Sequence, residues 1–208
     1  MAHMMTHLHA IKSFPWHHLH IPVLLNYVCM ITLTIARGAS TIQVAVEVLE
    51  MLYDKEDKFP GGGNVSHYFY KAFLDIWNAG MRDDFFILKS AFPTAELWVT
   101  GHSLGASIAT LAAGYIAALQ YYPANQIKLV TFGQPRTGDL GYATYIDNTV
   151  WYNNDMTVSN WYTECDEDES NKCSDQFEKN GIFGYDILDH LSYFNKLADY
   201  ATFGCPRH

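Results

Sequence analysis

The chain has 208 residues, 49% of them hydrophobic, which is enough to bury one sizeable core and predicts a single main folded domain. Its formal net charge of −9 at pH 7 argues against nucleic acid as a partner and against electrostatic docking on anionic membranes. Binding to a neutral lipid surface would therefore have to rest on apolar contacts.

Residues 1–35 are predicted to form a leader that precedes the main domain. They are rich in histidine, at positions His3, His7, His9, His17, His18 and His20. Because this spacing defines no closed metal site, a poorly ordered segment is preferred over a set of metal ligands. The apolar run 21–36 is interrupted by Asn26, so a buried strand over 28–35 is preferred over a signal-anchor. The leader lacks the features of a clear signal peptide.

Two helices are expected next. An amphipathic helix is predicted over residues 41–53, where apolar side chains recur at helical spacing, namely Ile42, Val46, Leu49 and Tyr53. The glycine-rich stretch 59–63 is predicted to be a flexible break. Asn64 is then expected to cap a long helix that runs to about residue 89. The apolar face of that helix carries Phe69, Phe73, Ile76 and Trp77.

The segment Gly101-His102-Ser103-Leu104-Gly105 has the pattern G-x-S-x-G. It follows an apolar, strand-like run at 97–100 and opens an alanine-rich stretch, 106–120, that is typical of a buried helix. A strand, a sharp turn and a helix together lift a serine hydroxyl out of a sheet, and the two glycines permit the tight turn. Ser103 is therefore the candidate nucleophile.

A further strand is predicted at 127–132, so strands and helices alternate along the chain. This order predicts an α/β fold with a mostly parallel, doubly wound sheet flanked by helices. Cys165 and Cys173 bracket a short acidic loop and are predicted to form a local disulfide. Asn64 begins a glycosylation sequon, Asn-Val-Ser. Both features indicate an oxidising compartment, so the protein is expected to be secreted or in the secretory pathway.

Four sequence blocks occur in the order found in the class 3 (fungal-type) lipase family. They are Arg37-Gly38-Ala39-Ser40, Thr100-Gly101-His102-Ser103-Leu104-Gly105, Phe132-Gly133-Gln134-Pro135-Arg136-Thr137-Gly138-Asp139 and Asp189-His190-Leu191-Ser192-Tyr193-Phe194. From about residue 37 to 203 the chain resembles this family, whose fold is the α/β-hydrolase. The resemblance implies a lipase-like domain over 36–208 that hydrolyses carboxylic esters of neutral lipids without a metal or organic cofactor.

Ester hydrolysis by this route needs a nucleophile, a base within hydrogen-bond reach and a group that orients the base. The resemblance assigns His190 as the base for Ser103. The backbone N–H of Leu104, directly after the nucleophile, is expected to donate to the oxyanion. By resemblance the second donor is the N–H of Ala39, where the family usually has Ser or Thr, so a hydroxyl contribution is lost here.

The third catalytic residue is where the chain departs from the family. The family carries its catalytic Asp on a strand some two dozen residues after the F-G-x-P-R-x-G block. Here residues 142–149 pass directly into 150–155, so about thirty residues, including that Asp and a strand near residue 150, are expected to be missing. Asp155, which follows a strand-like run at 149–152, is the best substitute acid, ahead of Asp147. The alternative for both residues is a solvated loop carboxylate, which is the commonest fate of Asp.

The sequence leaves three points open. The helix 41–53 lies near the position of the family's lid and could cover the site, or it could be an ordinary helix packed on the sheet. The chain could also be a lipase-like protein that binds lipid or a partner but turns over poorly. A general esterase or phospholipase would share the same triad.

Overall fold

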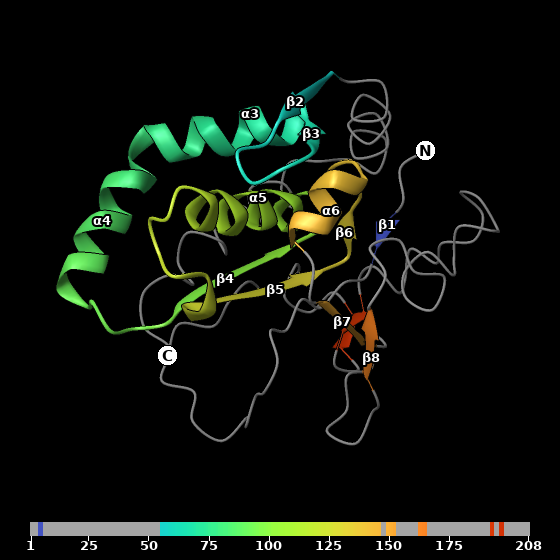
Figure 1. Cartoon of the computed structure of the whole chain (residues 1–208). Coiled ribbons are helices and arrows are strands. Elements are labelled where there is room, and N and C mark those ends of the chain that lie inside the picture. Colours follow the sequence, from blue (N-terminus) through green and yellow to red (C-terminus); the bar gives the residue numbers. More distant parts are fainter. Residues whose placement is uncertain are drawn as a thin grey trace.

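The computed structural model describes residues 55–146 in full, together with the backbone of the short strands at 4–5, 149–152, 162–165, 192–193 and 196–197 (Figure 1). The predicted leader, the strand at 28–35, the helix at 41–53 and the domain boundary after residue 35 lie outside the described residues.

Two parallel strands form the centre of the described fold. Strand β4 (Leu97–His102) pairs with β5 (Ile127–Phe132) in register from Leu97 opposite Ile127 to His102 opposite Phe132. Buried and half-buried residues alternate along both strands, because successive side chains of a strand point to opposite faces. The strand predicted at 127–132 is confirmed with its bounds, and the strand-like run at 97–100 is confirmed within β4.

Helix α5 (Leu104–Ala118) follows β4 directly and lies between α3 and the β4–β5 pair (Figure 1). It is buried almost all round, as expected for a helix without a distinct polar stripe. Small residues, mostly alanine and glycine, let the neighbouring elements approach its backbone closely. The helix predicted over 106–120 is confirmed, and it begins two residues earlier than expected.

The long helix predicted from Asn64 to about residue 89 is wrong as a single element. It consists of α3 (His67–Ile76), a π-helical turn η1 (Trp77–Met81) and α4 (Arg82–Ala91). The break lies at Gly80, whose φ of 138° belongs to the region that side-chain-bearing residues rarely adopt. The predicted apolar face is largely correct, because Phe69, Phe73 and Trp77 are buried against the core.

The glycine-rich stretch 59–63 is a tight hairpin turn, so the predicted flexible break is also wrong. It joins β2 (Glu56–Lys58) to the antiparallel β3 (Asn64–Ser66). The N–H of Phe59 donates to the carbonyl of Gly63 at 3.1 Å, and the N–H of Gly62 donates back to the carbonyl of Phe59 at 3.1 Å. The Phe59 side chain is buried in the core and anchors the turn. Asn64 therefore lies in a strand and does not cap the following helix.

The 3-10 turn η2 (Ala124–Gln126) leads into β5, and β6 (Gln134–Pro135) and α6 (Leu140–Ile146) follow β5. Strand β6 pairs with β1 (Met4–Met5), and β9 (Ser192–Tyr193) pairs with β10 (Lys196–Leu197).

Strand β7 (Thr149–Tyr152) confirms the predicted strand-like run and pairs antiparallel with β8 (Tyr162–Cys165). Only residues 147–148 separate α6 from β7, which leaves no room for another strand between them. Within the described part of the chain, none of the helices combines the length and apolar character needed to cross a bilayer.

Candidate active site

Ser103 occupies the turn between β4 and α5 in a conformation that few non-glycine residues adopt. Its φ of 56° and ψ of −130° place it outside the helical and strand regions. Such backbone strain is characteristic of functional sites, where the surrounding structure holds the residue in place. The N–H of Ser103 donates to the carbonyl of Phe132 at 2.9 Å, so the β4–β5 ladder extends into the turn itself. The predicted strand–turn–helix setting of the serine is thus present.

Gly101 allows β4 and α5 to meet at this sharp angle. A Cβ atom at this position would lie 2.3 Å from the carbonyl oxygen of Gly105 and 2.8 Å from the Cα of Ala106. Both contacts are with backbone atoms, which cannot rotate away as a side chain would. Glycine is therefore required at position 101 by the close approach of the strand to the first turn of the helix.

The N-terminus of α5 follows Ser103 directly. Leu104 is the first residue of the helix, so its N–H has no intrahelical carbonyl to donate to, whereas the N–H of Ala106 donates to the carbonyl of Ser103 at 2.9 Å. The Leu104 side chain is 2% exposed and anchors this turn in the core. A helix N-terminus favours negative charge through its exposed N–H groups and its dipole. The N-terminus of α5 can therefore stabilise an oxyanion that forms when Ser103 attacks an ester.

Four buried polar side chains link the first turns of α5 to the loop after β5. They are Ser107, Thr110, Gln134 and Thr137, none of them more than 6% exposed. The Thr110 hydroxyl donates to Gln134 Oε1 at 2.8 Å, and Gln134 Nε2 donates to Thr137 Oγ1 at 3.0 Å. The Thr137 hydroxyl donates to Ser107 Oγ at 2.9 Å, and the Ser107 hydroxyl lies 3.3 Å from the carbonyl oxygen of Pro135. We call these four residues the hydroxyl–amide network.

Asp139 fixes the far end of the same loop. Its Oδ1 accepts from the N–H of Tyr142 at 2.9 Å and so caps α6, and it also accepts from the N–H of Asn64 at 3.0 Å. Its Oδ2 accepts from Asn64 Nδ2 at 2.7 Å. Partial burial raises the pKa of the Asp139 carboxyl, but hydrogen bonds from Asn64, Tyr142 and Gly141 outweigh this effect and hold the pKa below its ordinary value. Asp139 is thus an ionised anchor between β3 and α6.

Several predicted site residues lie outside the described part of the chain. They are the base His190, the substitute acids Asp155 and Asp147, the second oxyanion donor Ala39, and Cys173. Cys165 ends β8, where only the backbone is described. Asn64 is described, and the nitrogen that would carry a glycan already donates one hydrogen to Asp139. The base, acid, disulfide and glycosylation assignments remain predictions.

The hydroxyl–amide network and the anchor Asp139 were not predicted from the sequence. A signal was available for part of it, because Ser107 and Thr110 are polar residues three positions apart in an otherwise apolar, buried helix. This spacing places both on one helix face, and buried hydroxyls require partners. The identity of those partners could not be inferred, since Gln134 and Thr137 come from a distant stretch of the sequence.

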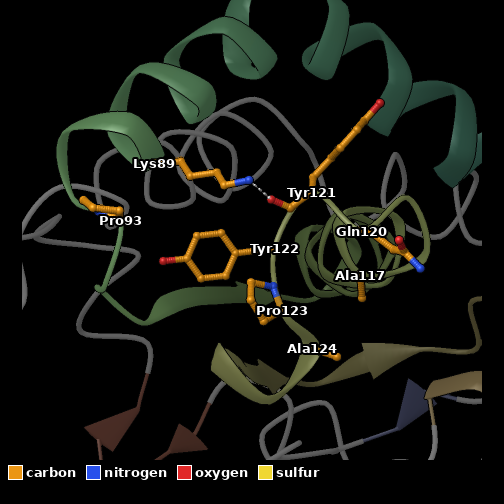
Figure 2. A pocket seen from close by; sticks show the side chains of 8 residues that line it. All are labelled: Lys89, Pro93, Ala117, Gln120, Tyr121, Tyr122, Pro123 and Ala124. Atoms are coloured by element: carbon orange, nitrogen blue, oxygen red, sulfur yellow. Dashed lines mark hydrogen bonds between the residues drawn. The ribbon is translucent and has the colours of Figure 1, made fainter.

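A separate crevice of about 580 Å³ lies at the other end of α5 (Figure 2). It is lined by Lys89, Pro93, Ala117, Gln120, Tyr121, Tyr122, Pro123 and Ala124. Pro93 precedes β4 and Ala124 precedes β5, so the crevice lies at the N-terminal ends of the strands and Ser103 at the C-terminal end of β4. In parallel sheets, reactive groups gather at the C-terminal ends, so the crevice is not the candidate active site. Among the side chains of residues 55–146, no three His, Cys, Asp or Glu groups cluster closely enough to hold a metal ion.

Comparison with known families gives a match over most of the described region. Residues 33–161, more than half of the chain, match the family described as lipase (class 3). The chain is 28% identical over 175 residues to secreted mono- and diacylglycerol lipase 1 of Fusarium solani, covering 66% of this chain and 50% of that relative. It is 34% identical over 117 residues to lipase ZK262.3 of Caenorhabditis elegans, covering 56% of this chain and 32% of that relative. The chain thus spans about half of these relatives or less.

A solved structure resembles the fold. Rhizomucor miehei lipase in its native propeptide complex superposes with a TM-score of 0.60 at 22% identity, covering 77% of this chain and 59% of that chain. At this level of identity the likeness concerns the fold alone. The fold is the α/β-hydrolase that the sequence predicted, with β4 and β5 as the described part of its parallel sheet and α5 as the helix that connects them.

Proposed function

The chain belongs to the class 3 lipase family, and from this premise we propose that it hydrolyses carboxylic esters of neutral lipids through an acyl intermediate on Ser103. The observation that carries the proposal is the strained turn at Ser103, which presents a hydroxyl at the N-terminus of α5. A non-glycine residue with this φ costs free energy, so its presence at a G-x-S-x-G turn indicates a role in chemistry.

In the proposed reaction, the Ser103 oxygen attacks the ester carbonyl as its proton passes to His190. The oxyanion is stabilised by the N–H groups of Leu104 and Ala39. His190 then returns the proton to the departing alcohol. In the second half of the reaction, water attacks the acyl-serine while His190 takes the proton of the water and passes it to the Ser103 oxygen, which releases the acid. The assignment of Leu104 rests on its place at the start of α5, and the assignments of His190 and Ala39 rest on the family resemblance.

Asp155 is proposed as the residue that orients His190. It follows β7 by a few residues, and the end of a strand is the position that an orienting acid requires. In the triad template, loss of the acid costs about 10⁴ in rate because the imidazole is no longer held in the correct tautomer.

We also propose that the protein is secreted. The Fusarium solani relative is named a secreted lipase, and the predicted disulfide between Cys165 and Cys173 and the sequon at Asn64 both suit the secretory pathway. The same relative is named for mono- and diacylglycerols, so these esters belong in the first substrate panel beside triacylglycerols and phospholipids.

One observation favours a second candidate function, a lipase-like protein that binds lipid but turns over poorly. The link between α6 and β7 is only residues 147–148, which is too short for the strand that carries the family's acid. If Asp155 does not replace that acid, the fold retains its nucleophile turn without an efficient base.

The deciding experiment is hydrolysis of a short-chain p-nitrophenyl ester by purified protein whose folding is verified by circular dichroism, with Ser103→Ala as the control. Ser103-dependent turnover is expected, with residual activity of the variant below about a thousandth of wild type. Equal turnover by both proteins would refute Ser103 as the nucleophile, and no turnover by the folded wild type would favour the binding function.

Asp155→Asn and Asp147→Asn form a matched pair for the acid. We expect a large fall in kcat for the first and little change for the second, with both variants folded. Unchanged kcat in Asp155→Asn would remove Asp155 from the site.

A further inference from the structure

The strained turn at Ser103 needs more than one attachment to stay in place. Two backbone hydrogen bonds hold it directly, from the N–H of Ser103 to Phe132 and from the N–H of Ala106 back to Ser103. Beyond Phe132 the chain leaves β5 through Gly133, whose φ is 55°, so the loop that follows is not held by the β4–β5 ladder. The loop begins directly after Phe132, so whatever fixes the loop against α5 adds a second attachment next to the bond between Ser103 and β5.

The hydroxyl–amide network provides this attachment. Ser107 lies four residues after Ser103, so it is one helical turn further along the same face of α5. Its hydroxyl meets both the carbonyl oxygen of Pro135 and the hydroxyl of Thr137, while Thr110 meets Gln134 one turn later. Consecutive turns of the helix are thus bound to the same short loop.

Gln134 is the central member of the network, because its amide both accepts and donates. Each threonine or serine hydroxyl has one hydrogen, and a single direction of donation satisfies the set, from Thr110 through Gln134, Thr137 and Ser107 to the carbonyl of Pro135. Gln134 is 6% exposed, so water does not compete for these bonds. Directional bonds in a buried site restrict position more tightly than apolar contacts of the same area.

We propose that Gln134 is a positioning residue for the reaction, holding the first turns of α5, and with them Ser103 and the N–H of Leu104, in the geometry that ester hydrolysis requires. The proposal rests on the proposed function of Ser103. Gln134 lies on β6 and acts through the network rather than by touching the substrate. A displacement of the nucleophile turn by an ångström is sufficient to reduce turnover strongly.

Gln134→Met separates positioning from general stability. Methionine has a similar volume, and it leaves no buried hydroxyl hydrogen without an acceptor. The Thr110 hydroxyl keeps the carbonyl of Ala106 at 2.9 Å, and the Thr137 hydroxyl keeps Ser107 or the carbonyl of Pro135 at 3.1 Å. The variant is therefore expected to fold, with only the bonds from Gln134 to Thr110 and Thr137 removed.

The kinetic test measures kcat and KM for p-nitrophenyl ester hydrolysis by wild type, Gln134→Met, Thr137→Val and the double variant. We expect kcat to fall about tenfold or more in each single variant while KM changes less than about twofold. The double variant should lose no more than the worse single variant, because both changes break one network. Thr144→Val is the control, since Thr144 makes a similar hydroxyl-to-carbonyl bond on the exposed face of α6, and its kcat should equal that of wild type.

Hydrogen–deuterium exchange tests the same proposal without any turnover. Peptides covering 101–108 should exchange faster in Gln134→Met than in wild type, while peptides covering α3 should exchange equally in both. Wild-type kcat together with unchanged exchange at 101–108 would overturn the proposal. If the wild type itself shows no Ser103-dependent hydrolysis, the proposed function fails, and the exchange result alone decides whether Gln134 holds the nucleophile turn.

Discussion

The two ends of α5 are held in place by different kinds of contact. At its N-terminus the helix is bound by directional hydrogen bonds among buried polar side chains, from Ser107 and Thr110 to the loop after β5. At its C-terminus it is held by aromatic rings. The indole of Trp77 stacks on Tyr121, with ring centroids 6.2 Å apart and planes 7° apart, and it meets Tyr115 edge-on.

A polar contact from Lys89 reinforces the aromatic end. Lys89 of α4 donates to the carbonyl of Tyr121 at 2.6 Å, and Figure 2 shows its side chain extended toward that oxygen. The carbonyl lies three residues beyond the last residue of α5, and the C-terminal end of a helix favours a positive charge nearby. Lys89 therefore secures the end of the helix and explains why a cation lines the crevice.

The difference between the ends follows from what each must fix. Aromatic packing supplies large apolar burial but allows small rotations of the rings, which is sufficient where only cohesion is needed. The N-terminus must fix individual atoms around Ser103, and hydrogen bonds specify distance and direction. Changes at the aromatic end should therefore alter stability alone, whereas changes at the polar end should alter turnover as well.

The largest effect is expected for Gly101→Ala. The added Cβ would overlap the backbone of Gly105 and Ala106, so we expect a loss of about 4 kcal/mol or more in the free energy of unfolding, or no soluble protein. Gly114→Ala is the matched control within α5. The atoms nearest to its Cβ are the end of the Ile146 side chain at 2.9 Å, which can move aside, and the Phe59 ring at 3.3 Å. Alanine also favours a helix by about 1 kcal/mol relative to glycine, so the change should be small. Urea unfolding of both variants makes the comparison, and equal stabilities would contradict the close approach at Gly101.

Trp77→Ala tests the aromatic end. Trp77 is 3% exposed and contacts four other aromatic rings, so its removal should lower the free energy of unfolding by about 3 kcal/mol. The kcat of the protein that remains folded should equal that of wild type, because Ser103 is held from the other end. Phe92→Ala is the control, since Phe92 is 58% exposed and its truncation should change stability little. A fall in kcat comparable to that of Gln134→Met would break the distinction between the two ends.

Lys89→Met should have a smaller effect of the same kind. Losing the bond to the Tyr121 carbonyl should cost about 1 kcal/mol in the free energy of unfolding. Lys71→Met removes a cation that pairs with Asp75 on the exposed face of α3, and its cost should be about half as large or less. The measurement is the shift of the urea midpoint in each variant, and a larger shift for Lys71→Met would show that Lys89 does not secure the helix end.

The pH dependence of stability tests the anchor of the polar loop. Because the pKa of Asp139 is lowered in the folded protein, its contribution is complete above the ordinary carboxyl pKa of 3.8 and is lost as the pH falls through the folded value. Asp139→Asn replaces one acceptor by a donor that faces Asn64, so we expect a cost of about 1 kcal/mol at pH 6. Unfolding measured at pH 6 and pH 3 should show a smaller difference between wild type and variant at pH 3. A difference that grew on acidification would contradict the sign of the pKa shift.

Much of the elbow could be predicted because its signals are local in the sequence. The apolar run before Gly101, the glycines beside Ser103 and the alanine-rich stretch after it each specify a conformation within a few residues, and β4 and α5 form there. The predicted cap at Asn64 failed for the opposite reason. Asparagine does favour helix starts, but here its side chain and N–H are bound by Asp139, far along the chain, which places Asn64 in a strand.

The break at Gly80 and the turn at 59–63 were also missed, because glycine is compatible with more than one local structure. A glycine inside an apolar helical pattern is compatible with one helix or with two. Here the break is accompanied by packing of Trp77 against Tyr115 on α5 and Tyr121 in the turn after it. Likewise, glycine-rich sequence permits both a flexible segment and a tight hairpin. Burial of Phe59 in the core accompanies the hairpin.

The sequence by itself determined the family, the α/β-hydrolase fold and the turn that presents Ser103, because these depend on short motifs and on the alternation of strands and helices. Only the tertiary structure decided which residues hold that turn. Gln134 and Thr137 belong to a block that the family shares, but their partners become visible only when folding places them beside Ser107, more than two dozen positions earlier in the chain. The packing of α5 against β5 determines which residues so far apart in the sequence become hydrogen-bond partners, and a local sequence pattern cannot predict this.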